Sequence, residues 1–542
     1  MKLLTIIVSL FLSIFSTIVM SYIGMAIPIG PWIAPTLALI AIVVYKIFCR
    51  AAYNCSKEIA LATSAGSVGG ILATAVGFYF TTLYFLEPNQ FALWISRPLY
   101  FSCVLGLLSF IAGLFGFWVA NLFEHKLIVQ DKLSFPIGML VYKTVAAYKE
   151  VKKSIELVVG FAATGIFCFL QDGLGSFKGV VYKSIVLISP KVISIFKIPM
   201  VRLDLWPMLW ALGFVTGHLI ALPLTVGVLS KILFIRPMHL FFFSRNLKWM
   251  EFILTFCSGM VLSTAIFGFI STPQYLWRSV KSLMNDTPKK DGSGTSLFEN
   301  VNGLETVFLL LLFIGFLSYF KFSFLSQIYL FVFSFICTYQ LAIIAGKIGL
   351  APMGKFATFV MVPAMFLFSL NAVQIVIVAS FVGICGGVAS DILFGRKLAY
   401  LSDISIKTIK RYQYFGLIVS SLSIGGVFWF LISKFQLGSD QLFALRAQNR
   451  WFLINTLKNV KGFDYNILII LMLGLCFGYV LSRLKISPLL VLGGLFMPIN
   501  ISLGLVIGAI GAMFVDDRQE WYPFWSGVYA SNSIWMLVKS IF

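Results

Sequence analysis

Ionisable side chains within long apolar stretches are the residues of this sequence best placed to do chemistry. Such groups are costly inside a membrane and usually carry protons, ions or substrate contacts. Asp391 stands out because it follows a glycine-rich apolar stretch and precedes a basic segment containing Lys397 and Tyr400. We predict an Asp391–Lys397 pair with a coupling role; the alternative is an interfacial salt bridge or a helix cap. The full candidate set is Asp172, Asp204, His218, Glu251, Asp391 and Lys397.

Motifs for covalent, phosphate or zinc chemistry are missing from the sequence. It contains no GxSxG, no P-loop and no HExxH. Its three histidines are not paired at metal-ligand spacing, and its eight cysteines form no CxxC. We therefore predict that the protein is not an enzyme and has no catalytic residue, no metal site and no cofactor.

The elements that must position these residues are membrane helices. Of the 542 residues, 60% are hydrophobic and 11% charged, against about 45–50% and 25% in soluble domains, and the mean hydropathy is +0.96. The net charge of +21 is dispersed between apolar segments, which is typical of loops facing anionic lipid rather than of a nucleic-acid-binding face. The composition predicts an all-α polytopic membrane protein with membrane lipid, and no nucleic acid, as a partner.

The apolar segments fit about 14–16 transmembrane helices in two related halves. The halves are 1–275 and 304–542, joined by a polar linker at 276–303. The stretches 206–235 and 356–388 are long enough to break in the middle. Lys and Arg in the loops 46–58 and 124–154 predict a multi-pass protein of the cell (inner) membrane with a cytoplasmic N-terminus. The basic segments 172–204 and 434–461 do not fit this alternation. We attribute this to a re-entrant or half-helix segment that the count of spans misses, and the topology of 172–235 stays open.

Glycine and proline interrupt the apolar sequence at 24–36, 132–138, 344–354 and 486–498. Proline breaks a helix, and unpaired backbone survives at membrane depth only where protein or a water-filled cavity satisfies it. Interruptions at matching places in two halves are typical of transporters; the alternative is that small residues merely allow close helix packing. The predicted substrate-binding residues are Gly30, Pro31, Trp32, Ser134, Phe135, Pro136, Gly138, Gly349, Pro352, Gly354, Gly493 and Gly494.

Several of these stretches, in order, resemble the oligopeptide transporter (OPT) superfamily of peptide and yellow-stripe-like metal-chelate carriers. VQDKLSFPIGMLVYKTV (129–145) is similar to the family's basic-Leu-x-Phe-Pro-Glu-Gly stretch, and IAGKIGLAPMGKF (344–356) to its Gly-Leu-x-Pro-x-Gly segment. GGVASDILFGRKLAYL (386–401) resembles its Asp-Leu-Lys loop, matching at Asp391, Lys397 and Tyr400.

The resemblance implies a secondary transporter that moves small peptides, peptide-like siderophores or metal chelates by proton symport and alternating access. Two family acids are replaced here, by Ile137 and Gly395. Proton coupling would then fall to Asp391, Glu156 or Asp172. A degenerate, non-transporting protein and a membrane-embedded lipid-modifying enzyme remain alternatives, and the oligomeric state is open.

Overall fold

The chain is described here from a computed structural model. The structure describes residues 2–26, 32–48, 55–133, 135–146, 151–174, 177–182, 184–188, 201–216, 218–243, 249, 252–253, 255–257, 259–260, 263, 303–348, 351–439, 442–458, 465–484, 486, 488, 491, 494–495, 499–517 and 520–541. The predicted linker 276–303 lies outside these residues except for its last position.

Contacts divide the chain into two compact units. Unit 1 comprises Met1–Ala146 and Ala265–Trp451, and unit 2 comprises Ala147–Thr264 and Phe452–Phe542. Each unit therefore combines two segments that are separated in the sequence. The predicted halves 1–275 and 304–542 concern internal repetition rather than contacts, and they stay a prediction.

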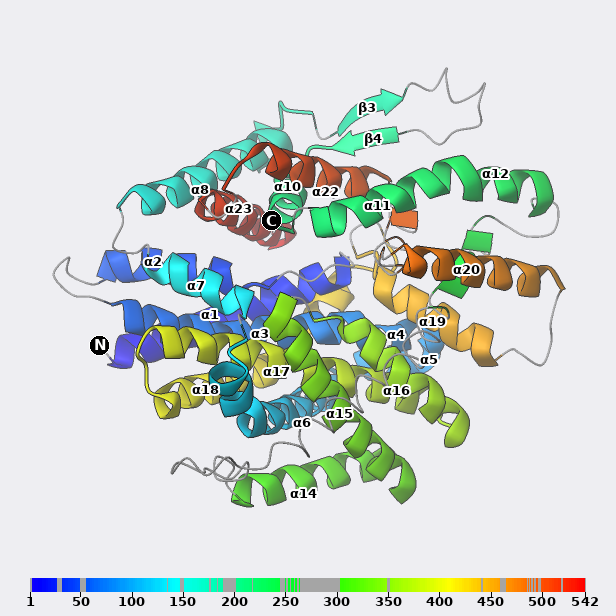
Figure 1. Cartoon of the computed structure of the whole chain (residues 1–542), viewed down its shortest axis with the longest axis horizontal. Coiled ribbons are helices and arrows are strands. Elements are labelled where there is room, and N and C mark those ends of the chain that lie inside the picture. The colour runs from blue at the N-terminus through cyan, green and yellow to red at the C-terminus, as the bar shows by residue number, and fades with distance from the viewer. Residues whose placement is uncertain are drawn as a thin grey trace. The chain divides into compact units, whose positions relative to one another are not determined.

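Unit 1 is helical throughout its described part (Figure 1). Its elements are α1 (Lys2–Ala26), α2 (Ala34–Phe48), α3 (Ser56–Tyr79), α4 (Thr82–Leu86), α5 (Pro88–Ile95), α6 (Pro98–His125), the π-helical turn η1 (Lys126–Gln130), α7 (Pro136–Ala146), α14 (Gly303–Tyr319), α15 (Phe324–Ile348), α16 (Met353–Leu367), α17 (Ala372–Leu401), α18 (Ile406–Lys434) and the start of α19 (Leu445–Lys458).

Two helices form the centre of unit 1. α3 is buried from Ile59 to Tyr79, and α17 from Ala372 to Ala399. α3 packs against α1, α2, α17 and α18, while α17 packs against α6, α7, α15 and α16. Small residues allow this closeness: a Cβ at Gly69 of α3 would lie 2.7 Å from the α1 backbone. The stretches 63–75 and 379–390 thus serve close helix packing, the simpler of the two interpretations of small residues.

Unit 2 contains helices and two short β-hairpin-like pairs. Its helices are α8 (Val151–Asp172), α10 (Pro207–Thr216), α11 (His218–Ser230), η3 (Lys231–Ile235), α12 (Arg236–Met238), η4 (His239–Phe243), α20 (Tyr465–Arg483), α22 (Ile499–Gly511), η5 (Ala512–Phe514) and α23 (Tyr522–Ile541). α8 packs against α23, and α10 against α22.

The basic segment 172–204, which does not fit the predicted alternation of spans, contains short strands among its described residues. β1 (Gly173–Leu174) pairs antiparallel with β2 (Phe177–Lys178), and β3 (Ser184–Ile188) pairs antiparallel with β4 (Val201–Asp204). Strand pairing satisfies backbone hydrogen bonds within this segment, and its topology stays a prediction.

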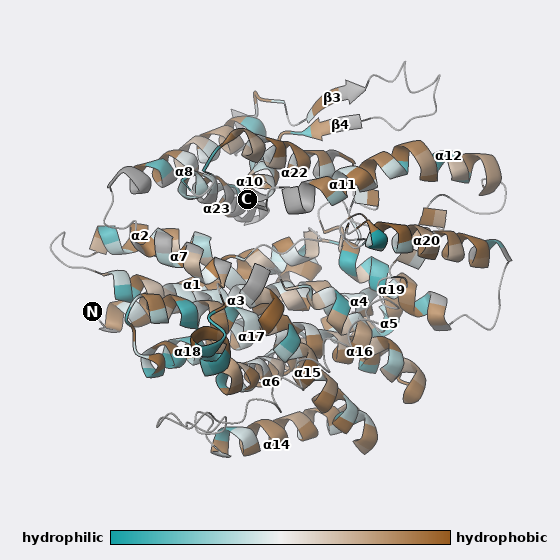
Figure 2. Ribbon diagram, viewed as in Figure 1, coloured by the Kyte–Doolittle hydropathy of each residue, from teal (hydrophilic) through white to brown (hydrophobic). Residues whose placement is uncertain are grey.

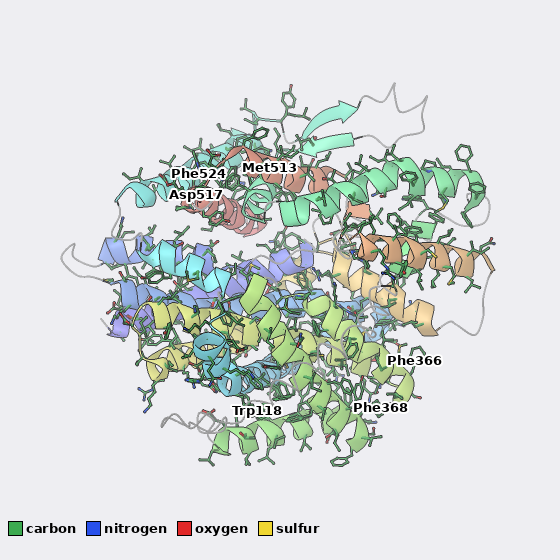
Figure 3. All side chains as sticks on the ribbon, viewed as in Figure 1. Trp118, Phe366, Phe368, Met513, Asp517 and Phe524 are labelled. Carbon is green, nitrogen blue, oxygen red and sulfur yellow. The ribbon has the colours of Figure 1, made fainter. Side chains whose placement is uncertain are left out.

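The all-α polytopic class is confirmed. Seven described helices are long and apolar enough to cross a membrane, and six shorter apolar helices accompany them; the expected total of 14–16 spans stays a prediction. The break expected within 356–388 lies at 368–371, where Asn371 caps α17. Hydrophobic residues dominate the helices, with hydrophilic turns in α18 and α19 (Figure 2). Phe366 and Met513 are among the exposed apolar side chains, and Phe366 lies at the edge of the view (Figure 3).

Candidate functional site

Two of the four predicted helix interruptions meet in unit 1. One lies between η1 and α7, and the other between α15 and α16. The backbone N–H of Phe135 donates a 2.8 Å hydrogen bond to the carbonyl of Gly346, which joins the two directly. Phe135 has φ +46°, a left-handed conformation that bulky residues rarely adopt. Such strain persists only where the surroundings enforce it, and it is concentrated at functional sites.

Three predicted site residues converge on one turn of α17. The ring of Trp32 meets the ring of Phe394 edge-on at 4.8 Å between centroids, and Phe135 meets the same ring at 6.0 Å. Gly138 of α7 lies so close that a Cβ there would stand 2.6 Å from the Phe394 carbonyl oxygen. The first and second interruptions of the sequence are therefore in one place, against the buried helix α17.

The remaining predicted binding residues divide into three groups. Gly354 lies in the first turn of α16, directly after the non-helical Pro352, and a Cβ there would lie 3.2 Å from Nη1 of Arg446. Gly494 belongs to unit 2, where it packs against Gly227 of α11. The side chain of Pro136 and the residues Gly30, Pro31, Ser134, Gly349 and Gly493 lie outside the described residues.

Arg446 and Arg450, one turn apart on α19, are two site residues that the sequence reasoning missed. The guanidinium of Arg446 lies 4.3 Å from the ring centroid of Phe78, and that of Arg450 lies 4.3 Å from the ring centroid of Tyr79. Arg450 is 7% exposed and donates a 2.8 Å hydrogen bond to the carbonyl of Phe78. The i, i+4 spacing of two arginines on a polar helix is the signal that could have identified them.

Arg450 is a cation without an acidic partner among the described residues. Its Nε atom and the nearby hydroxyl of Tyr79 are buried without hydrogen-bond partners in the described structure. Burial lowers the pKa of Arg450 to about 10, so the guanidinium stays charged at neutral pH. A buried cation of this kind is costly unless an anion reaches it.

Asp391 is the opposite case, an acid without a described cation. It lies in the second half of the apolar helix α17, 2% exposed, and accepts a 2.7 Å hydrogen bond from the hydroxyl of Ser67 on α3. The predicted pairing with Lys397 is not formed, because residues six apart on a helix point to different faces. Nor is Asp391 a cap, since α17 begins 19 residues before it.

The other predicted coupling residues lie apart from Asp391. The Nζ atom of Lys397 lies 5.7 Å from the ring centroid of Tyr400, which is 54% exposed near the end of α17. Asp172 ends α8 in unit 2, where the indole of Trp535 donates a 3.1 Å hydrogen bond to its carboxylate. The side chains of His218 and Glu251 lie outside the described residues.

A buried ionic network at one end of unit 1 was also missed. Arg396 of α17 donates to the carboxylate of Glu124 at 2.7 Å and to the amide oxygen of Asn121 at 2.5 Å, both on α6. Lys410 of α18 lies 3.5 Å from the same carboxylate. Because each charge here has an oppositely charged neighbour, the network joins three helices rather than presenting a free charge.

The two replaced family acids occupy different surroundings. Ile137 is half-buried in α7. Gly395 faces α3 and α18, where a Cβ would overlap Ser64 Oγ and approach Gln413 Nε2 to 2.5 Å. A side chain at position 395 would therefore require the side chains of Ser64 and Gln413 to move.

Interrupted apolar helices that meet at a buried helix are typical of polytopic membrane transporters. The model of the OPT oligopeptide transporter protein family matches residues 3–531. The chain therefore belongs to this family, and it is a transporter rather than an enzyme. No relative among curated proteins matches it.

Proposed function

We propose that this protein moves small peptides, or peptide-like solutes such as siderophores and metal chelates, across the cell (inner) membrane by proton-coupled alternating access. One observation carries the proposal: unit 1 buries an acid, Asp391, and a cation, Arg450, neither of which has an oppositely charged partner among the described residues. The acid can therefore bind a proton, and the cation can bind an anionic group of a solute.

The two charges lie along the same buried helix. Asp391 bonds Ser67 of α3, and Arg450 covers Tyr79 of α3, twelve residues further on. At 1.5 Å per residue this separation is about 18 Å along the helix. Arg450 therefore does not neutralise Asp391. It is placed to receive the carboxylate of a solute, with Arg446 and the α16 interruption beside it.

Asp391 is the group we assign to the proton. An ionised carboxylate buried with a single hydroxyl is costly, so binding and release of a proton there can be linked to conformational change. The two acids of the family pattern are replaced here by Ile137 and Gly395. We therefore assign proton binding in unit 1 to Asp391.

The charge distribution of unit 1 supports a cytoplasmic N-terminus. Basic residues gather where α6 and α17 end and α18 begins, a region we call the basic end, formed by Lys126, Arg396, Lys397, Lys407, Lys410 and Arg411. Lys57 at the start of α3 joins it by donating to the carbonyl of Asp403 at 2.9 Å. The positive-inside rule favours a cytoplasmic location for this end.

The test is uptake into liposomes by the purified protein, using a di- to hexapeptide pool and ferric siderophores, with and without an inward proton gradient. We expect gradient-driven accumulation, and Asp391→Asn should abolish the effect of the gradient while leaving binding. Arg450→Gln should remove the preference for peptides with a free over an amidated carboxyl terminus, which Arg450→Lys should partly keep. Arg483→Gln, an exposed arginine in unit 2, is the matched control.

The contrary results are equally specific. An Asp391→Asn variant with an unchanged gradient dependence would return Asp391 to a structural role. Equal uptake of free and amidated peptides by the unaltered protein would remove Arg450 from solute binding. Absence of flux for every member of the pool would favour a non-transporting, degenerate member of the family.

A further inference from the structure

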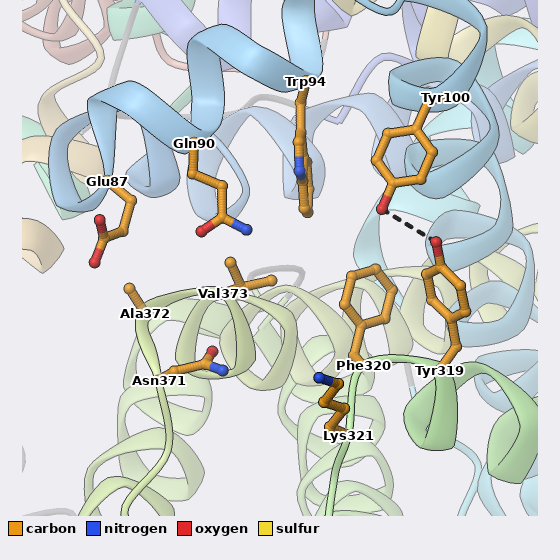
Figure 4. Close-up of a pocket in the computed structure, with 10 residues that line it drawn as sticks. All are labelled: Glu87, Gln90, Trp94, Tyr100, Tyr319, Phe320, Lys321, Asn371, Ala372 and Val373. Carbon is orange, nitrogen blue, oxygen red and sulfur yellow. Dashed lines mark hydrogen bonds between the residues drawn. The ribbon is translucent and has the colours of Figure 1, made fainter.

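A cavity of about 340 Å³ lies in unit 1 at the end opposite the basic end (Figure 4). It forms where α5 and the start of α6 face the turn between α14 and α15 and the N-terminus of α17. Asn371 at this N-terminus is twenty residues from Asp391, or about 30 Å along the helix. The cavity is therefore distinct from the interior site proposed above.

One wall of the cavity is a turn held in a strained conformation. Lys321 has φ +59°, which a side-chain-bearing residue rarely adopts. The side chain of Gln374 donates to the carbonyls of Phe320 and Lys321 at 3.0 and 3.1 Å, fixing the turn over the start of α17. Gln374 also forms a capping box with Asn371. Strain that several bonds enforce indicates that the position of Lys321 matters.

Aromatic rings line the middle of the cavity. Trp94 is 7% exposed, and its ring lies 5.7 Å from that of Tyr100 and 6.2 Å from that of Phe320. The hydroxyls of Tyr100 and Tyr319 lie 3.4 Å apart (Figure 4). These rings offer an apolar surface with a polar edge, as small-molecule sites commonly do.

Charges of opposite sign line two facing walls of the cavity. Glu87 projects from the start of α5, with Gln90 beside it, and Lys321 projects from the facing turn (Figure 4). Glu87 and Lys321 form no ion pair with each other in the described structure. The N-terminus of α17, with Asn371 and Ala372 in the lining, adds positive potential to the cavity.

We propose that this cavity binds a zwitterion, with its ammonium group at Glu87, its anionic group at Lys321 and an apolar side chain against Trp94. The bound molecule is either a free peptide, in which case the cavity is an entry site for transported solutes, or the ammonium-phosphate headgroup of a lipid. This inference depends on the proposed function in one respect: the proposed orientation puts the cavity on the side of the membrane opposite the cytoplasm.

The experiment measures binding to the full-length protein in phosphatidylglycerol nanodiscs by calorimetry. The probes are Phe-Ala, N-acetyl-Phe-Ala, Phe-Ala amide and glycerophosphoethanolamine. Glu87→Gln should weaken Phe-Ala about two- to fivefold, the range of solvent-screened ion pairs, and should no longer distinguish Phe-Ala from its acetylated form. Lys321→Gln should likewise stop distinguishing Phe-Ala from its amide. Lys434→Gln, exposed on α18 and outside the cavity lining, is the control and should change nothing.

The outcomes separate the two sources and the two proposals. Binding of Phe-Ala with this dependence on both charges supports a peptide entry site, even if Asp391→Asn leaves transport unchanged. Binding of glycerophosphoethanolamine alone, with the same dependence, supports a lipid headgroup site. The proposal is overturned if neither probe binds, or if binding is the same in both variants as in the unaltered protein.

Discussion

Replacing Gly395 with alanine is the sharpest test of how unit 1 is packed. In α17 this residue faces Ser64 of α3 and Gln413 of α18. The added Cβ would overlap the Ser64 hydroxyl and press on the Gln413 amide, which bonds Ser64 Oγ at 3.0 Å and the carbonyl of Ile392 at 3.1 Å. One methyl group therefore disturbs the contact of three helices.

The expected cost follows from two effects. Overpacking a tight interior costs about 1–3 kcal/mol, and each displaced hydrogen bond adds about 0.5–1.5 kcal/mol. With two bonds displaced the sum is about 2–6 kcal/mol, and the higher helix propensity of alanine offsets about 1 kcal/mol. We therefore expect Gly395→Ala to lower the free energy of unfolding by about 1–5 kcal/mol. Denaturant titration of the purified protein in mixed micelles, followed by tryptophan fluorescence, measures the change.

A second variant separates this clash from a general loss of helix packing. Ser64→Ala removes the overlapping hydroxyl, so the double variant Ser64→Ala with Gly395→Ala should recover at least about 1 kcal/mol relative to the sum of the single variants. Gly426→Ala is the control, because a Cβ at Gly426 of α18 meets no atom within 4 Å. Strictly additive effects at 64 and 395, or a Gly395→Ala protein as stable as the control, would refute the reasoning.

Three further predictions concern the network, the interruption and the orientation. Arg396→Gln should cost about 3–5 kcal/mol because Glu124 then loses its closest cation, and adding Glu124→Gln should restore part of the loss in the same unfolding assay. Gly138→Leu should insert into the membrane but lose both uptake and stability, since its side chain meets the α17 backbone; full uptake would contradict this assignment. In a chain without other exposed cysteines, Ser96→Cys should react with an impermeant thiol reagent from outside intact cells and Lys407→Cys only after permeabilisation; the reverse pattern would invert the proposed orientation.

The helical class and most helix positions could be predicted because the membrane fixes the length and polarity of each span. The breaks before α7, α16 and α17 were predicted for a similar reason: proline and a capping asparagine act locally. The pairs of the segment 172–204 were not predicted, since short strands with basic residues lack both a long apolar run and clear alternation.

The polar contacts of the site could not be predicted from the sequence because they join residues that are far apart in the chain. Ser67 and Asp391 are 324 positions apart, and Glu124 and Arg396 are 272 apart. Nothing near Asp391 in the sequence distinguishes a bond to Ser67 from the ion pair expected with Lys397. Helix geometry excludes the latter once α17 is known to be continuous from 372 to 401.

The contrast between paired and unpaired buried charges separates structure from function in this molecule. Arg396 and Glu124 neutralise each other, so the neighbouring helices α6, α17 and α18 gain a fixed junction and no free charge. Asp391 and Arg450 bear the cost of burial without such a partner in the described structure. A protein selected only for stability would replace both with apolar residues at a gain. Both charges have a function if a proton binds Asp391 and an anionic solute binds Arg450 during each transport cycle. Their substitution should therefore alter transport more than stability.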